Sequence, residues 1–208
     1  MKIIHTSDIH LDSPLTTRLP SDKIRQRRRE LLASFTRMID EARAIGADAV
    51  IIAGDLFDSE HITKKALDTA LDVIEKAKEL TFFYLSGNHE KGALTSSGRA
   101  MPKNLVTFGD DWTYYTSAGV TIAGRNMLST DMFTTLSLPA DTKNIVVLHG
   151  EARDGASSPE IIGLRDAAQK GIDYMALGHY HSYSRTEIDE RGYAVYSGTP
   201  EGRGFNAR

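Results

Sequence analysis

The chain has 208 residues, of which 40% are hydrophobic, a formal net charge of −3 and no cysteine. This length and composition are typical of one globular domain with a substantial core. The lack of cysteine excludes disulfides, thiolate nucleophiles and cysteine-ligated zinc or iron–sulfur sites. The negative charge counts mildly against a protein that binds DNA tightly over many phosphates. It is compatible with an enzyme whose bound metal ions offset its acidic ligands.

The N-terminus has no signal-like apolar segment. No apolar run approaches the roughly 20 residues that span a bilayer. We therefore expect a cytoplasmic protein without a membrane partner.

The first part of the chain alternates strands and helices. Apolar runs predict strands over 2–6, 49–53 and 81–85. Between them, apolar residues at helical spacing predict one helix from Ser21 or Asp22, as its cap, to a stop at Gly46, and a second over 66–77. This order indicates right-handed crossovers and a mainly parallel sheet.

The second part is richer in strands. Strands are predicted over 105–108, 120–123, 145–148, 174–177, 183–187 and 193–196, with one helix near 161–170. A change from helix-rich to strand-rich sequence favours two packed sheets flanked by helices. We expect one domain over 1–208.

Five polar clusters follow predicted strands. They are D-x-H at 8–10, G-D-x-x-D at 54–58, G-N-H-E at 87–90, H-G at 149–150 and G-H-x-H at 178–181. In open α/β sheets, sites form at the carboxyl ends of strands. In extended backbone, residues two apart point to one side, so we expect Asp8 and His10 to point to the same side, and likewise His179 and His181.

Each cluster alone also has an ordinary structural interpretation, as a polar turn or a buried histidine. Asp58 either orients a ligand or caps the next helix. However, five of the seven histidines fall in these clusters, and only His5 and His61 do not. This distribution favours a metal site.

The ordered motifs resemble the calcineurin-like metallophosphoesterase superfamily, with Glu90 in place of the usual aspartate. The resemblance implies a four-layer α-β-β-α sandwich of two mixed sheets. It implies one ion bound by Asp8, His10, Asp55 and His181, and another bound by Asp55, Asn88, His149 and His179. His89 would contact the phosphate and assist the leaving oxygen.

Two ions about 3.5–4 Å apart can hold a bridging hydroxide that attacks phosphorus during in-line displacement. Nitrogen and oxygen ligands suit Mn²⁺, Fe or Zn²⁺. We expect Mn²⁺, by analogy with the nuclease branch.

Residues 5–14, 53–58 and 196–205 are similar to the SbcD/YhaO-type DNA-repair exonuclease branch. That resemblance implies DNA as substrate, and an SbcC-like ATPase subunit and a second copy of the chain as partners. SbcD-type proteins continue into a capping domain, which is absent from this sequence. The chain is therefore expected to be either a shortened form or a minimal member.

A basic stretch comprises Lys23, Arg25 and residues 27–29. It is either a phosphate-contacting face or the solvated side of the first helix.

Three functions compete. The leading one is a metal-dependent DNA nuclease, an exonuclease or endonuclease in repair. The alternatives are a small-substrate phosphodiesterase or phosphatase with the same metals, and a non-catalytic metal-binding scaffold. Fold and ligands do not separate the first two, because substrate choice depends on loops and added domains.

Overall fold

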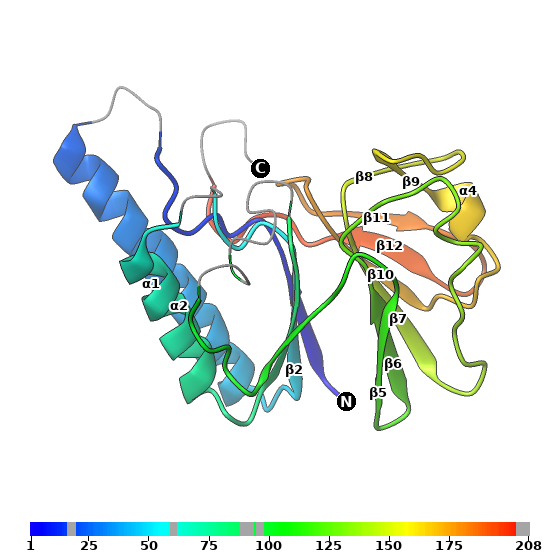
Figure 1. Ribbon diagram of the computed structural model, residues 1–208, viewed down its shortest axis with the longest axis horizontal. Coiled ribbons are helices and arrows are strands. Elements are labelled where there is room, and N and C mark those ends of the chain that lie inside the picture. Colours follow the sequence, from blue (N-terminus) through cyan, green and yellow to red (C-terminus); the bar gives the residue numbers. More distant parts are fainter. Residues whose placement is uncertain (16–19, 59–61, 88–93, 95–97, 203–208) are drawn as a thin grey trace.

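The structure is a computed structural model, and it describes residues 1–15, 20–58, 62–87, 94 and 98–202 (Figure 1). The first sheet has four strands in the order β1-β2-β3-β4, all parallel. Two helices connect its first three strands. The elements of this half are β1 (Ile3–Thr6), α1 (Ser21–Ala44), β2 (Ala49–Ala53), α2 (Lys64–Lys76), β3 (Thr81–Leu85) and β4 (Leu105–Thr107).

The second sheet has six strands in the order β11-β12-β10-β7-β6-β5. Its inner strands are parallel, while β11 and β5 pair antiparallel at the two edges. Its strands are β5 (Thr113–Ser117), β6 (Val120–Gly124), β7 (Lys143–His149), β10 (Tyr174–Gly178), β11 (Ser184–Glu187) and β12 (Tyr193–Tyr196). This half of the chain also contains a separate two-stranded ribbon and a short helix. These are β8 (Glu151–Arg153), β9 (Ile161–Gly163) and α4 (Leu164–Ala167).

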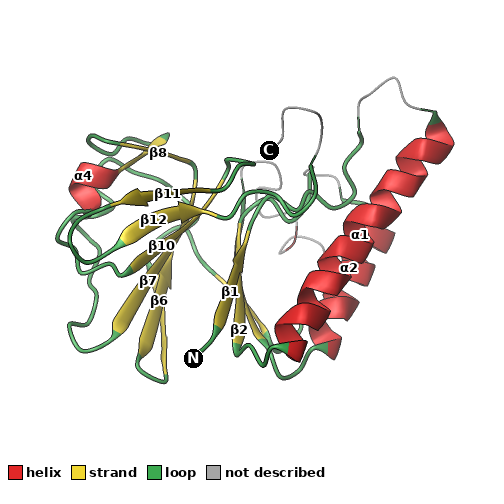
Figure 2. Cartoon of the chain, turned by 180° about the vertical axis from the view of Figure 1, so that it is seen from behind, coloured by secondary structure: helices red, strands yellow, loops and turns green. Residues whose placement is uncertain are grey.

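Three apolar interfaces separate four layers (Figures 1 and 2). Helices α1 and α2 lie side by side on the outer face of the first sheet, where Phe35 and Leu71 are fully buried. Between the two sheets, Ile51 of β2 packs in one cluster with Val147 of β7. On the outer face of the second sheet, Phe133 and α4 cover β7 and β10. The predicted sandwich of two sheets is confirmed, although the first sheet is wholly parallel and only the second is mixed.

Three local predictions differ from the structure. The helix expected near 161–170 is wrong at its start, because Ile161–Gly163 pairs with β8 as strand β9 and only Leu164–Ala167 is helical. Strand β5 was not predicted, because its mostly polar residues lie at a half-exposed edge. Pro20, with no side-chain cap, precedes α1 in place of a Ser21 or Asp22 cap, and Ile45 ends the helix just before Gly46.

Two arginines of the basic stretch bind the protein itself. Arg28 Nε donates to the carbonyl oxygen of Ser13 at 2.8 Å, and Arg27 Nη2 donates to that of Gly202, also at 2.8 Å. These contacts attach α1 to two loops near the carboxyl ends of the strands. The stretch is therefore partly structural and not wholly a free phosphate-binding face.

Within the described ranges, no helix is both long and apolar enough to cross a bilayer.

His5 gives the fold a predicted pH dependence. Burial between the sheets lowers the pKa of His5 from 6.5 to about 4, against an opposing contact with the main chain of Leu177. Its Nδ1 lies 2.9 Å from the hydroxyl of Tyr174 on β10. Below pH 6.5 the unfolded chain takes up a proton that the folded chain takes up only near pH 4, so acid favours unfolding in this window.

We expect the free energy of unfolding to fall by about 2 kcal/mol more between pH 7 and pH 5 in the wild type than in His5→Asn, which keeps a polar atom near Tyr174. Urea titrations with a chelator at each pH measure this difference. Parallel pH profiles of the two proteins would exclude His5 as the cause.

Candidate metal centre

The loops that follow β1 and β2 run side by side at the carboxyl ends of the first sheet. The amide of Asp8 donates to the carbonyl oxygen of Gly54 at 3.1 Å, and the amide of His10 donates to that of Asp55 at 3.0 Å. All three predicted ligands here have left-handed backbone, with φ of 53° at Asp8, 52° at His10 and 52° at Asp55. The expectation of extended backbone between Asp8 and His10 is therefore wrong. Such strained conformations cluster at functional sites, where the surrounding bonds hold them.

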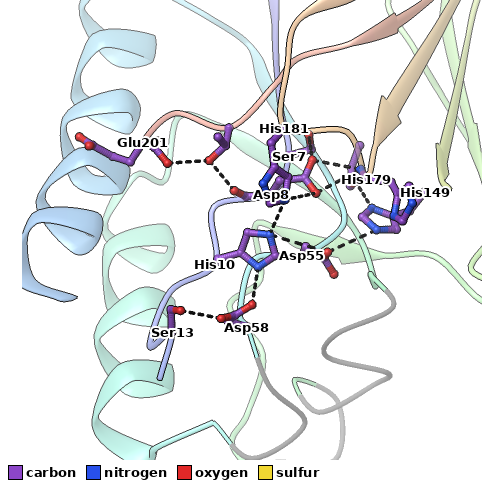
Figure 3. A network of polar contacts seen from close by, with 12 residues as sticks. Ser7, Asp8, His10, Ser13, Asp55, Asp58, His149, His179, His181 and Glu201 are labelled. Carbon is purple, nitrogen blue, oxygen red and sulfur yellow. Dashed lines mark hydrogen bonds and ion pairs between the residues drawn. The ribbon is translucent and has the colours of Figure 1, made fainter. Parts of the chain in front are cut away.

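The first group of potential ligands comprises Asp8, His10 and His181, whose ligand atoms all lie within 4.8 Å of one another (Figure 3). The Nε2 atoms of His10 and His181 face each other at 3.1 Å. The Oδ1 of Asp8 lies 3.9 Å from Nε2 of His181. Asp8 is wholly buried and acidic, so a cation beside these imidazoles would compensate its charge.

The second group comprises Asp8, Asp55 and His149. Asp8 belongs to both groups. Asp55 also approaches the first group, since its Oδ2 lies 3.5 Å from Nε2 of His149 and 3.9 Å from Nε2 of His10. Asp55 therefore lies near histidines of both groups, and its role as a carboxylate shared by two ions stays a prediction.

His179 lies beside the second group but is not a member of it among the described residues. Its amide donates to both carboxylate oxygens of Asp8 at 3.1 Å, and its ring centroid is 5.6 Å from that of His149. Burial and the neighbouring His149 lower the pKa of His179. Burial also disfavours the charged form of His149, but its bonds with Asp55 and Ala53 outweigh this and raise its pKa.

One histidine is fixed in the tautomer that metal binding needs, and a second has a carboxylate beside the same ring nitrogen. His149 Nδ1 lies 2.9 Å from the carbonyl oxygen of Ala53, which can only accept, so Nδ1 carries the proton. His10 Nδ1 lies 2.9 Å from Oδ1 of Asp58. In both rings the other nitrogen, Nε2, is the one that points into the ligand groups. The donor set therefore fits divalent metal ions.

Asp58 orients His10 and does not cap the next helix. Its second oxygen accepts a bond from Ser13 Oγ at 2.5 Å. Helix α2 is instead capped by Thr63, whose side chain accepts from the amide of Ala66. The two alternatives for Asp58 are thus resolved in favour of ligand support.

We expect Asp58→Asn to weaken metal binding about tenfold, because the carboxylate that orients the His10 ring is lost. Asp68→Asn on α2, which removes one ion pair with Arg99, is the control. Calorimetric titration with Mn²⁺ compares the two. Equal affinities in both variants would rule out the orienting role.

Three glycines leave room that the site needs. A Cβ at Gly87 would lie 1.9 Å from Oδ1 of Asp55, and one at Gly54 would lie 2.2 Å from Nδ1 of His149. A Cβ at Gly178 would lie 1.9 Å from the carbonyl oxygen of Ala53. These distances are impossible for a real side chain, so any larger residue must displace a ligand or the strand beneath it.

We expect Gly87→Ala to lower phosphodiesterase activity on the order of a hundredfold, because Asp55 is displaced from between the two groups. Gly109→Ala is the matched control, since its nearest contact would be at an ordinary 3.6 Å. Circular dichroism checks that both variants fold. Full activity in Gly87→Ala would show that Asp55 tolerates the displacement.

Asn88 and His89 lie outside the described residues. The strand that leads to them, β3, ends at Leu85, and the amide of the next residue, Ser86, donates to Oδ1 of Asn126 at 3.0 Å. Asn126 also donates to the carbonyl oxygen of Phe108 at 2.7 Å. It was not singled out by the sequence, although it closely follows a predicted strand. Asn126 therefore secures the start of the segment that carries two predicted site residues.

A groove of about 1210 Å³ opens beside His149 and His179. Its far wall comes from the β8–β9 ribbon and from the loop after β6, including Met127, Leu128 and Ile161. A substrate bound at the metal centre has room to extend in this direction.

Comparison with known proteins gives one family over nearly the whole chain. The Metallophos family, described as calcineurin-like phosphoesterase, matches residues 1–201. The chain is 27% identical over 231 residues to the DNA double-strand break repair protein Mre11 of Methanopyrus kandleri, covering 97% of this chain and 49% of that protein. It is 26% identical over 218 residues to Mre11 of Saccharolobus solfataricus, covering 97% and 55%. The chain thus spans about half the length of these relatives.

Solved structures support the fold. A Thermus thermophilus protein superposes with a TM-score of 0.60 at 14% identity, covering 95% of this chain and 89% of that one. A dimetal phosphatase from Danio rerio superposes with a TM-score of 0.57 at 12% identity, covering 95% and 86%. With the family match over residues 1–201 and two adjoining ligand groups at the sheet edge, the chain belongs to the calcineurin-like phosphoesterase family.

Proposed function

We propose that this chain is a two-metal phosphodiester hydrolase that cuts DNA, as an exonuclease or endonuclease subunit in repair. The observation that carries the proposal is the place of Asp55, whose Oδ2 lies within 3.9 Å of one histidine from each ligand group. A carboxylate shared in this way is suited to two ions at the short spacing of two-metal enzymes.

One ion would be held by Asp8, His10, Asp55 and His181, and the other by Asp55, Asn88, His149 and His179. Mn²⁺ is the proposed metal, with Fe or Zn²⁺ as substitutes. When bound, the ions supply a nucleophile from water and offset charge on the phosphate. The role proposed for His89 is to contact the phosphate and to protonate the leaving oxygen.

The DNA substrate is supported by the relatives, both of which are DNA double-strand break repair proteins. An SbcC-like ATPase subunit and a second copy of the chain stay predictions from the resemblance.

One observation favours the alternative, a small-substrate phosphodiesterase or phosphatase. The groove beside His149 carries the carboxylates of Asp110, Glu151 and Glu160, and its arginine is already paired. Arg153 donates to both oxygens of Glu151, at 2.7 and 2.8 Å. An acidic groove lining of this kind does little to attract the phosphates of a DNA backbone, which basic residues normally contact.

Cleavage assays separate the two functions. The purified chain with Mn²⁺ is tested on linear duplex DNA, on single-stranded DNA and on bis(p-nitrophenyl) phosphate. The nuclease proposal expects cleavage of at least one DNA substrate that stops when a chelator is added. Hydrolysis of the small diester with no cleavage of either DNA would leave the small-substrate function as the correct one.

A further inference from the structure

Residues 197–202 link the two halves of the metal centre. This crossing segment leaves β12 in the second sheet and ends against α1, which packs on the first sheet (Figures 1 and 3). At its far end, Ser34 of α1 donates to the carboxylate of Glu201, and Arg27 lies 3.2 Å from the same carboxylate. The segment is thus attached to the second sheet at one end and to the helix that packs on the first sheet at the other.

Thr199, in the middle of the crossing segment, bonds to the main chain of two predicted ligands. Its hydroxyl lies 2.8 Å from the carbonyl oxygen of Asp8 and 3.1 Å from that of Glu201, and it donates to the nearer one, that of Asp8. Its amide donates to the carbonyl oxygen of His181 at 3.2 Å. Asp8 follows β1 in the first sheet and His181 follows β10 in the second, yet both belong to the first ligand group. Thr199 therefore bonds to two predicted ligands from different sheets. The distance between these ligands depends on how the two sheets pack against each other.

The ligands held by Thr199 need such support. Asp8 has left-handed backbone with φ of 53°, a conformation that surrounding bonds must maintain. His181 has a side chain that is 32% exposed, whereas that of His10 in the same group is 1% exposed. Packing alone therefore constrains His181 less than its partners.

A second contact of the crossing segment reaches the carboxylate of Asp8. Ser7 Oγ donates to Oδ2 of Asp8 at 2.5 Å, and Ser197 Oγ lies 2.8 Å from Ser7 Oγ. Ser197 can therefore donate to Ser7 and keep it directed at Asp8. The segment supports Asp8 on both its main chain and its side chain.

We propose that Thr199 is a positioning residue, which sets the spacing of Asp8 and His181 and thereby the affinity of the Asp8–His10–His181 group for a divalent cation. The inference rests on the proposed metal site. The second group shares Asp8, but its other members are Asp55 and His149, whereas Thr199 bonds to Asp8, His181 and Glu201. The effect of Thr199 should therefore fall mainly on one of two ions.

The test compares Mn²⁺ binding to the whole chain and to three variants. Thr199→Val removes the hydroxyl at nearly constant volume, and Thr199→Ser restores it. Thr36→Val is the control, because Thr36 is also half-buried and donates to a main-chain carbonyl, that of Leu32, at 2.9 Å. Calorimetric titration gives the affinity of each ion, and electron paramagnetic resonance distinguishes a coupled Mn²⁺ pair from a single ion.

We expect Thr199→Val to weaken one of the two ions about tenfold and to replace the coupled signal by that of a single ion at limiting Mn²⁺. Thr199→Ser and Thr36→Val should bind both ions like the wild type. Wild-type binding of both ions by Thr199→Val, or equal weakening in Thr36→Val, would overturn the proposal. So would a failure of serine to restore binding.

Two further results keep the outcome clear. If Thr199→Val does not fold, Ser197→Ala tests the same segment and should weaken the same ion. A wild type that binds no pair of ions would overturn the metal site and this inference together. A pair of ions that is sensitive to Thr199, in a chain that cleaves no phosphodiester, would support the positioning role and refute only the proposed function.

Discussion

Asp55→Asn is expected to lower phosphodiester hydrolysis on the order of a thousandfold or more and to reduce Mn²⁺ binding from two ions to at most one. Asp55 is 2% exposed, and its Oδ2 lies between His10 and His149. Asparagine keeps the shape but loses the charge and one of the two equivalent oxygens. Loss of residues that merely support a ligand already weakens binding or activity about 10- to 100-fold.

Metal content by elemental analysis and turnover of bis(p-nitrophenyl) phosphate measure the two effects of Asp55→Asn. Asp40→Asn is the matched control, because Asp40 is exposed on α1 and, among the described residues, forms a surface ion pair with Arg43. Two bound ions and normal turnover in Asp55→Asn would refute the bridging role, and with it the observation that carries the proposed function.

His89→Ala is expected to lower turnover about 10²- to 10⁴-fold, the usual contribution of a general acid. The number of bound metal ions should not change, because His89 is assigned to the phosphate and not to an ion. His61→Ala is the control, as His61 lies in none of the five motifs. Loss of a metal ion in His89→Ala would make the residue a ligand, and unchanged turnover would remove it from catalysis.

Much of the fold could be predicted from the sequence, because its signals are local. The run from Ala49 to Ala53 is apolar at every position and forms a strand buried throughout. The apolar stripes of α1 and α2 have helical spacing and cover one sheet face. Where the pattern failed, a long-range partner decided the structure. Residues 161–163 have no helix-breaking residue before Gly163, but they pair with β8 and become a strand.

For the candidate site, too, the sequence predicted some features and the tertiary structure decided others. The sequence by itself determined which residue types are present and that they follow strands, and parallel strands bring their carboxyl ends to one edge. That was enough to predict Asp8, His10, Asp55, His149, His179 and His181 as neighbours, and the described residues place them together. Asn88 and His89 stay predictions.

Only the tertiary structure decided how these side chains are held. The left-handed backbone at Asp8 and His10 arises from bonds to the loop after β2, some 45 residues away in the chain. The choice of role for Asp58 follows from its contact with His10, and the role inferred for Thr199 follows from bonds to two different sheets. Local sequence patterns carry propensities within one element, whereas these contacts join elements whose distance is set by packing. The ligands could therefore be read from the motifs, but their supports could be found only in the folded chain.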